Sequence, residues 1–160
     1  MRKKKLDSLL ELDSNALLSL NNAHVVELSW LERQHFDRMI LSAFYARGIA
    51  PAKAFLMAFD QAAEYDNYNF LWFRSRYDRF IYVDRIVVES SCRGQGAAHA
   101  LYEDLFDRAR SQRQSLIVCE VNVDPPNPAS DMFHKQMGFK QVGESLTPSG
   151  KRVKYLAKEI

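Results

Sequence analysis

The sequence predicts an α/β fold in which one central sheet mixes parallel and antiparallel strands and is flanked by helices. Two stretches carry this prediction. Residues 80–121 read as strand, glycine turn, helix and strand, which implies a right-handed crossover and a parallel pair. Residues 140–160 read as two strands around a turn. The length of 160 residues and the apolar fraction of 47% are typical of one globular domain, spanning residues 1–160.

The first part of the chain is predicted to be helical. Asp13 or Ser14 can cap a short helix that ends near the Asn21–Asn22 pair. The sequence Ser29-Trp30-Leu31-Glu32 has the form of a capping box. Apolar residues then recur at steps of three and four, which predicts a helix of about 14 residues with one buried face. These residues are Phe36, Met39, Ile40, Ala43 and Phe44.

Gly48 and Pro51 break that helix, and residues 54–59 read as a short buried strand. Between residues 60 and 79 the sequence predicts a long connection, and long ordered loops are often lids or binding loops. Its aromatic residues are Tyr65, Tyr68, Phe70, Trp72, Phe73 and Tyr77. We expect them either to pin the loop to the core or to form a wall facing a substrate.

The central stretch supplies the parallel pair. Residues 80–88 form a predicted strand, and residues 97–110 a predicted helix whose apolar residues fall on one line. Residues 115–121 are an apolar run interrupted by Glu120, which predicts a strand buried on both faces.

The last part of the chain continues the pattern. Asn127 suits an N-cap and Pro128 the first helical position, so a helix is predicted up to Met137, with Gly138 as its stop. Two strands are predicted around the turn at residues 147–150.

Charge and hydropathy argue against several partners. The net charge is +2, with 22 basic and 20 acidic residues intermixed. We expect the basic run Arg2–Lys5 to be a solvated end and predict no nucleic-acid partner. No apolar run approaches the roughly 18 residues that a membrane span needs, which predicts no membrane partner.

Cysteine and histidine usage predicts no metal site. Cys92 and Cys119 have no metal-binding or redox spacing, which favours a reducing, cytoplasmic setting. The four histidines lack the paired helical spacing of a zinc site.

The turn between the 80–88 strand and the 97–110 helix favours an anion site. The first amides of a helix have no internal partner, and the helix dipole is positive there. The sequence Arg93-Gly94-Gln95-Gly96-Ala97-Ala98 fits neither a P-loop nor a dinucleotide fingerprint. A tight turn into a surface helix is the alternative.

A second motif narrows the choice. Asn127 is followed seven residues later by a histidine and then by Gly-Phe. Together the two motifs resemble the GNAT superfamily of acyl-CoA-dependent N-acyltransferases, with its Arg/Gln-x-x-Gly-x-Gly/Ala turn and its later Asn, Tyr and Gly-Phe. The matching residues are Arg93, Gly96, Ala98, Asn127, His134 and Gly138–Phe139. His134 replaces the tyrosine of the family, and the resemblance implies a GNAT-like fold.

The resemblance implies a coenzyme A site. The amides of the turn would hold the pyrophosphate, and small residues there let the backbone approach closely. These residues are Arg93, Gly94, Gln95, Gly96, Ala97 and Ala98. Ile86, Val87 and Val88 would pair through their main chain with the pantetheine arm, and Phe133 is assigned to the same site. Asn127 would bind the pantetheine, cap its helix, or do both.

The reaction that the resemblance implies is attack of an amine on an acyl thioester, which needs a base. Glu120 is the preferred base, acting directly or through a water, because an unpaired carboxylate inside an apolar strand is expected to face a cleft. A structural ion pair with Arg85 is the alternative. Asp84 is a second candidate, as base or as amine-binding group.

His134 is open to several interpretations. It can act as an acid, as a hydrogen-bond donor to the sulfur, or have no catalytic role, the thiolate then leaving unaided; it can also complete the helix surface beside Lys135. We favour the donor to the sulfur. Cys119 is expected to be core rather than a nucleophile, and Cys92 and His99 receive no role.

The sequence therefore predicts an acyl-CoA N-acyltransferase that transfers acetyl from acetyl-CoA directly to a primary amine of a small molecule or peptide. A catalytically silent acyl-CoA-binding module is the alternative. The acceptor pocket is expected from the N-terminal helices and the 60–79 loop, with aromatic walls near Asp66. The oligomeric state is open, with a homodimer among the alternatives.

Overall fold

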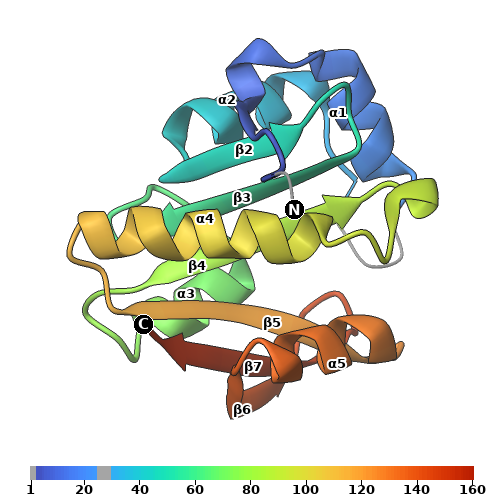
Figure 1. Ribbon diagram of the computed structural model, residues 1–160. Helices are drawn as coiled ribbons and strands as arrows, with labels where there is room; N and C mark the ends of the chain where they lie inside the picture. Colours follow the sequence, from blue (N-terminus) through green and yellow to red (C-terminus); the bar gives the residue numbers. More distant parts are fainter. Residues whose placement is uncertain (1–2, 25–29) are drawn as a thin grey trace.

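The computed structural model describes residues 3–24 and 30–160. Within them one sheet has the strand order β1-β2-β3-β4-β5-β7-β6 (Figure 1). The strands are β1 (Asp7–Ser8), β2 (Tyr45–Ile49), β3 (Ala54–Asp60), β4 (Ile81–Val88), β5 (Leu116–Asp124), β6 (Lys140–Leu146) and β7 (Arg152–Glu159). The helices are α1 (Ser14–Asn22), α2 (Arg33–Ser42), α3 (Tyr68–Arg74), α4 (Ala97–Ser111) and α5 (Pro128–Gln136). Two short 3-10 helices span Leu9–Glu11 and Ser90–Cys92.

The sheet is mixed, as the sequence predicts. β4 and β5 pair in parallel, and the neighbouring strands elsewhere in the sheet pair antiparallel. The last strand, β7, lies between β5 and β6, so the two C-terminal strands complete the sheet beside the parallel pair.

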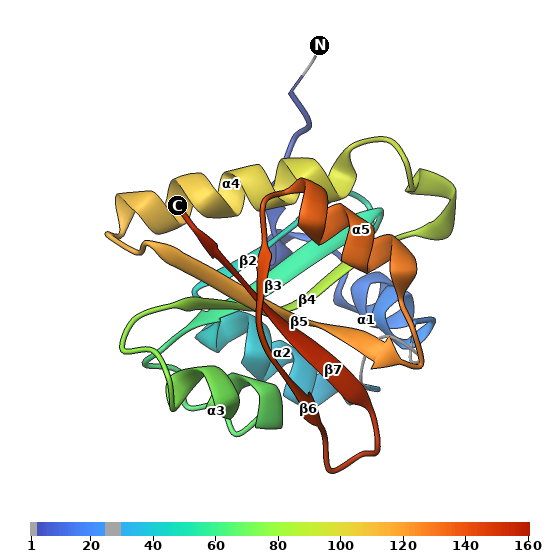
Figure 2. The same cartoon turned by 90° about the horizontal axis from the view of Figure 1, so that it is seen from below.

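Helices cover both faces of the sheet. α4 and α5 lie on one face, and α1, α2 and α3 on the other (Figure 2). β3 serves both layers because its side chains alternate: Phe55, Met57 and Phe59 join the core under α1, α2 and α3, whereas the alternate residues join the core under α4. Full burial of each such large apolar side chain stabilises the fold by about 1.5–3 kcal/mol.

A β-bulge distorts the middle of β4. Met57 of β3 pairs with Arg85, and the next residue, Ala58, pairs with Val83. Asp84 is thus the extra residue on β4. A bulge bends its strand and increases the local twist.

The parallel pair is short. Ile81 pairs with Ile117 and Tyr82 with Val118, and both pairs precede the bulge. Past this point a cavity of about 90 Å³ lies between the two strands. The bulge therefore coincides with the place where β4 and β5 separate.

The second helix is shorter than the sequence predicts. α2 begins at Arg33 after Glu32, whose side chain makes no capping bond, and Ser29 of the predicted capping box lies outside the described residues. α2 ends at Ser42, and residues 45–49 form β2, a strand that the sequence analysis missed. The predicted helix is too long because residues 45–49 pair with β3, and this pairing overrides any local preference for helix beyond Ser42.

The predicted long connection at residues 60–79 contains a helix. Asn67 caps α3 by accepting hydrogen bonds from the amides of Asn69 (2.9 Å) and Phe70 (3.1 Å). Phe70 and Phe73 are fully buried, and most of the other aromatic residues pack against the same core. The interpretation of these rings as a cluster that holds the segment down is confirmed; Tyr68, 43% exposed, is the exception.

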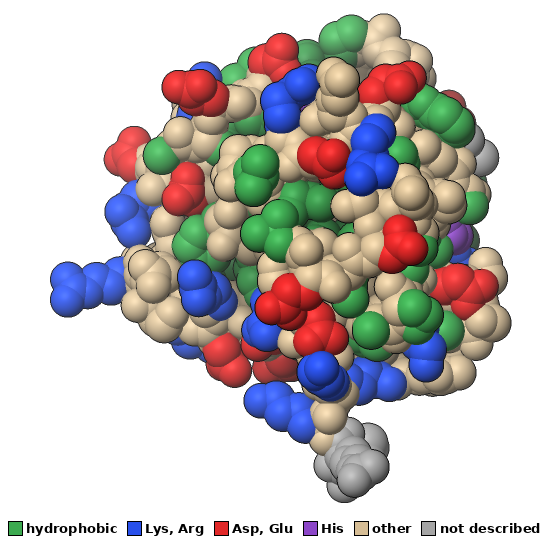
Figure 3. Space-filling model, turned by 90° about the horizontal axis from the view of Figure 1, so that it is seen from above, with side chains coloured by type: hydrophobic (Ala, Val, Ile, Leu, Met, Phe, Trp, Pro, Cys, Tyr) green, Lys and Arg blue, Asp and Glu red, His purple; other side chains and the backbone are tan. Residues whose placement is uncertain are grey.

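The surface carries both signs of charge. On the face shown in Figure 3, basic and acidic side chains are interspersed with apolar and neutral ones. No helix in the described ranges is long and apolar enough to cross a membrane.

Candidate active site

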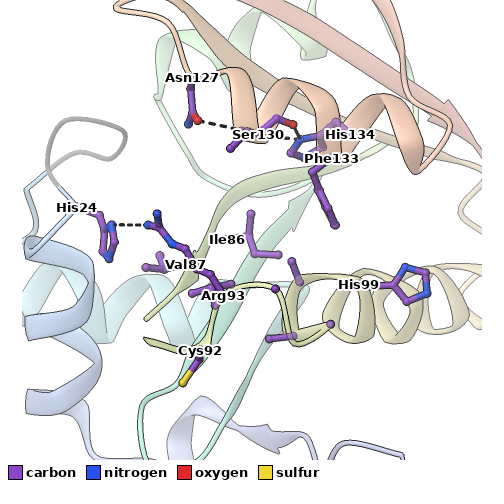
Figure 4. Close-up of a pocket in the computed structure, with 16 residues that line it drawn as sticks. His24, Ile86, Val87, Cys92, Arg93, His99, Asn127, Ser130, Phe133 and His134 are labelled. Carbon is purple, nitrogen blue, oxygen red and sulfur yellow. Dashed lines mark hydrogen bonds between the residues drawn. The ribbon is translucent and has the colours of Figure 1, made fainter. Parts of the chain in front are cut away.

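A cleft of about 450 Å³ opens where β4, the glycine turn and α5 meet (Figure 4). The predicted cofactor residues that line it are Ile86, Val87, Val88, Arg93, Gly94, Gly96, Ala97, Ala98, Asn127 and Phe133. Gln95 does not line it, because its side chain turns away and donates a hydrogen bond to the Ser91 carbonyl at 3.3 Å. Lining residues that the sequence analysis left unassigned are His24, Cys92, His99, Ala129 and Ser130.

The glycine turn leaves helix amides available. Gly94 and Gly96 have φ of 75° and 81°, a left-handed conformation that glycine adopts without strain. Gly96 is the N-cap of α4, and no side chain in the described part of the chain caps this terminus. The first amides and the positive end of the helix dipole therefore border the cleft, which suits an anion.

The opposite wall comes from α5. Asn127 lines the cleft and also caps α5, accepting a hydrogen bond from the Ser130 amide at 3.3 Å. Phe133 points into the cleft (Figure 4). Across the mouth, the Arg93 guanidinium lies 3.4 Å from Nδ1 of His24, which brings the turn close to the end of α1.

His134 is buried, with 3% of its surface exposed, so it does not complete the helix surface. Its Nδ1 lies 2.7 Å from the Ser130 carbonyl, which can only accept, so Nδ1 carries the proton. Its Nε2 lies 2.6 Å from the Tyr102 hydroxyl. Burial lowers the pKa of His134 below its usual value. The ring is thus neutral, and Tyr102 donates to Nε2.

The small cavity between β4 and β5 lies between the cleft and a second, polar cavity. It shares Ile86, Ser130 and His134 with the cleft. With the polar cavity, of about 280 Å³, it shares Asp84, Arg85, Glu120 and Asn122. The cleft and the polar cavity therefore border the same gap, where the two strands separate.

The polar cavity draws part of its wall from the 60–79 segment that the sequence predicts for the acceptor pocket. That part is the start of α3; the β6–β7 turn supplies the other side, and α1, α2 and Asp66 do not line the cavity. Its lining residues are Asn67, Tyr68, Asn69, Asp84, Arg85, Glu120, Asn122, Thr147, Pro148, Ser149, Lys151 and Val153. The expected aromatic wall is absent among them apart from Tyr68, because the other rings of that segment pack into the core.

Glu120 faces this polar cavity. The Tyr82 hydroxyl lies 2.9 and 2.7 Å from its two oxygens, and the Asn69 amide donates at 3.1 Å. Burial raises the pKa of Glu120 to about 7, against the hydrogen bonds from Tyr82 and Asn69, which lower it. The expected alternative, an ion pair with Arg85, is wrong.

Arg85 pairs with Asp84 instead. The guanidinium Nε lies 2.6 Å from an Asp84 oxygen, and both side chains are almost fully buried. Tyr65 donates to the other Asp84 oxygen, and Arg85 donates to Asn21 of α1 at 2.8 Å. Asp84 is thus held in a buried ion pair with a guanidinium, whereas the hydrogen-bond donors to Glu120 are neutral side chains.

Cys119 is buried, as expected for a core residue, and burial raises the pKa of its thiol. The described ranges contain no group of three histidine, cysteine or carboxylate side chains arranged for a metal ion.

The hydrogen-bond partners of the candidate catalytic residues are Tyr82, Tyr102 and Asn69. None of them was assigned a role from the sequence: Tyr82 lies in the predicted 80–88 strand, Tyr102 in the predicted 97–110 helix, and Asn69 in the predicted 60–79 connection. A polar atom at a buried position needs a partner, so a tyrosine inside an apolar strand or helix face was the available signal.

Solved structures resemble the chain over nearly its whole length. The ribosomal-protein-S18-alanine N-acetyltransferase from Escherichia coli has a TM-score of 0.71 and 16% identity, covering 98% of this chain and 93% of that chain. NAA60 from Arabidopsis thaliana in complex with acetyl-CoA has a TM-score of 0.70 and 14% identity, with 98% of each chain covered. An agmatine N-acetyltransferase has a TM-score of 0.67 and 11% identity, covering 99% and 100%. At these identities the likeness shows the fold.

The family comes from the sequence itself. No curated protein matches the chain significantly. The sequence model described as the Acetyltransferase (GNAT) family matches residues 22–139, which is most of the chain and includes both motifs. The chain therefore belongs to the GNAT family of acetyltransferases.

Proposed function

We propose that the protein binds acetyl-CoA in the cleft beside α4 and α5 and transfers the acetyl group directly to a primary amine of a small molecule or peptide. The observation that carries this proposal is the gap between β4 and β5, whose residues line both the cleft and the polar cavity. It places a cleft suited to a phosphorylated cofactor on one side and a polar cavity with a carboxylate on the other.

The cofactor half of the proposal rests on the glycine turn. The uncapped amides of α4 would hold the pyrophosphate, and the main chain at Ile86–Val88 would pair with the pantetheine arm. The thioester would then lie at the gap where β5 no longer pairs with β4.

The chemical half rests on Glu120. An amine bound in the polar cavity must lose a proton to attack, and a carboxylate with a pKa near 7 can accept it, directly or through a water. The C–N bond forms as the C–S bond breaks, and the thiolate takes up a proton. A buried polar environment of this kind is typical of a tuned base.

His134 has no free N–H for the sulfur. Its Nδ1–H donates to the Ser130 carbonyl, and its Nε2 accepts from the Tyr102 hydroxyl. In place of the favoured donor to the sulfur, we therefore propose that the thiolate leaves without a proton from the ring and that the imidazole holds the Tyr102 hydroxyl in place.

A thiol-release assay can identify the class of amine that the protein acetylates. Purified protein with acetyl-CoA should release thiol with at least one member of a panel of amines, amino acids and peptides, and Glu120→Gln should lower that rate by about 10²–10⁴-fold at neutral pH. Binding of CoA without thiol release by any acceptor would favour a silent binding module. Undiminished activity in Glu120→Gln would remove the proposed base.

A further inference from the structure

A chain of side chains from three other elements holds the Glu120 carboxylate. The Asn69 amide, on α3, donates to Oε1 at 3.1 Å. Behind it, the Tyr155 hydroxyl, on β7, lies 2.8 Å from Oδ1 of Asn69. The Tyr82 hydroxyl, on β4, contacts both carboxylate oxygens. Glu120 thus receives donors that come from outside its own strand.

The orientation of the Asn69 amide follows from chemistry. An ionised carboxylate can only accept hydrogen bonds, so the NH₂ group of Asn69 must face Glu120. Its carbonyl oxygen then faces Tyr155, whose hydroxyl donates. Both ends of the amide are used, and a flip would place two acceptors against each other.

Tyr155 is itself held in place. Its ring stacks on Trp72 with the centroids 4.0 Å apart and an interplanar angle of 22°. The Arg76 guanidinium lies 3.7 Å from the Trp72 ring centroid, and a Cβ at Gly143 of β6 would come within 2.5 Å of that ring. The indole is packed so closely that Tyr155 has little room to move.

The structure of α3 does not need the Asn69 side chain. Asn67 caps this helix, and Phe70 and Phe73 are its buried apolar side chains. Within residues 3–24 and 30–160, the Asn69 side chain forms its hydrogen bonds with Glu120 and Tyr155. The Asn69 amide therefore serves to hold the Glu120 carboxylate and is not needed to stabilise α3.

We propose that Asn69, held by Tyr155, is the positioning residue of the general base, fixing the Glu120 carboxylate toward the acceptor cavity and favouring its ionised form. The identification of Glu120 as the general base rests on the proposed function. The hydrogen bonds from Tyr155 to Asn69 and from Asn69 to Glu120 do not depend on it. A donor to the carboxylate stabilises the anion against the cost of burial, so more Glu120 is ionised at neutral pH.

The test is a direct titration of Glu120 by carboxyl carbon-13 NMR in protein without substrates, with the signal assigned through Glu120→Gln. We expect Asn69→Ala to raise the pKa of Glu120 by about one unit, and Asn69→Asp to raise it further because a like charge replaces the donor. Tyr155→Phe, which keeps Asn69 but releases its carbonyl, should give a smaller rise. Asn122→Ala is the matched control, because Asn122 lines the same cavity without a hydrogen bond to Glu120 among the described residues.

The pH dependence of kcat/KM separates this inference from the proposed function. If Asn69→Ala shifts the carbon-13 titration of Glu120 and the acidic limb of the activity profile together, the positioning role of Asn69 and the base function of Glu120 are both supported. If the carbon-13 titration shifts and the activity profile does not, Asn69 still positions Glu120, but Glu120 is not the base. The inference is overturned if Asn69→Ala leaves the titration unchanged or if Asn122→Ala shifts it equally; if Asn69→Ala fails to fold, Tyr155→Phe decides by the same criterion.

Discussion

At the scale of single residues, Glu120 and His134 show opposite effects of burial. Burial raises the pKa of the carboxylic acid and lowers that of the imidazole, because in both cases it disfavours the charged form. Glu120 can therefore take a proton near neutral pH, whereas His134 stays neutral. Each has a buried tyrosine as hydrogen-bond donor.

The first prediction concerns stability. A pKa raised from 4.5 to about 7 means that Glu120 contributes stability that is present at low pH and is lost as pH rises through about 7. Between about pH 4.5 and pH 7, the free energy of unfolding of the wild type should fall by about 3 kcal/mol relative to that of Glu120→Gln. Urea unfolding at a series of pH values measures this. Parallel curves for the two proteins would contradict it, and Glu103→Gln, a half-exposed carboxylate on α4, controls for surface charge.

The second prediction concerns His134. His134→Phe should lower turnover by less than about tenfold, because the neutral ring has no free N–H for the sulfur and its loss leaves only the Tyr102 hydroxyl without this partner. Turnover and cofactor binding are measured separately.

Tyr102→Phe is the control for His134→Phe. It removes the same hydrogen bond but keeps the imidazole. A loss confined to His134→Phe assigns the effect to the ring, and an equal loss in both assigns it to the pair. A loss of about 100-fold or more in His134→Phe alone would contradict this prediction and show that the ring acts as an acid or donor.

At the scale of elements, the strand, turn and helix from β4 to α4 form the most predictable part of the molecule. The glycines at 94 and 96 permit a left-handed turn, and the turn delivers uncapped amides to the cleft. A side chain at either position opposes that conformation whether or not there is space for it.

The third prediction tests the turn. Gly96→Ala should weaken CoA binding about tenfold, because an alanine shifts the turn and moves the amides, although the nearest atom to the added Cβ is 4.0 Å away. Activity with S-acetylpantetheine, which lacks the pyrophosphate, should fall less. Calorimetry and kinetics measure the two.

Gly150→Ala is the matched control for Gly96→Ala. Gly150 has φ of 85° and open space around it, but lies in the β6–β7 turn outside the cofactor cleft. Equal weakening of CoA binding in both variants would show that strain anywhere in the fold, rather than the amide cradle, causes the loss.

At the scale of the whole molecule, short sequence patterns predicted the helices and strands that adjacent residues determine. Asn127 with Pro128 marked the start of α5, and the apolar run around Glu120 marked β5, because caps and buried runs are written in adjacent residues. β2 and α3 were missed because pairing with β3 and packing on the core decide them. The bulge at Asp84 and the Asn69–Glu120 contact span distant segments, so no spacing in the sequence announces them.

The position of β7 bears on the order in which the site is assembled. Tyr155 lies opposite Glu120 in the β5–β7 register and also holds the Asn69 amide. Arg152–Glu159 is the last strand of the chain and enters between two strands that precede it in the sequence. The Asn69 donor is therefore fixed by Tyr155 only when β7 is paired with β5, which makes the acid–base behaviour of Glu120 a reporter of whether this strand is in place.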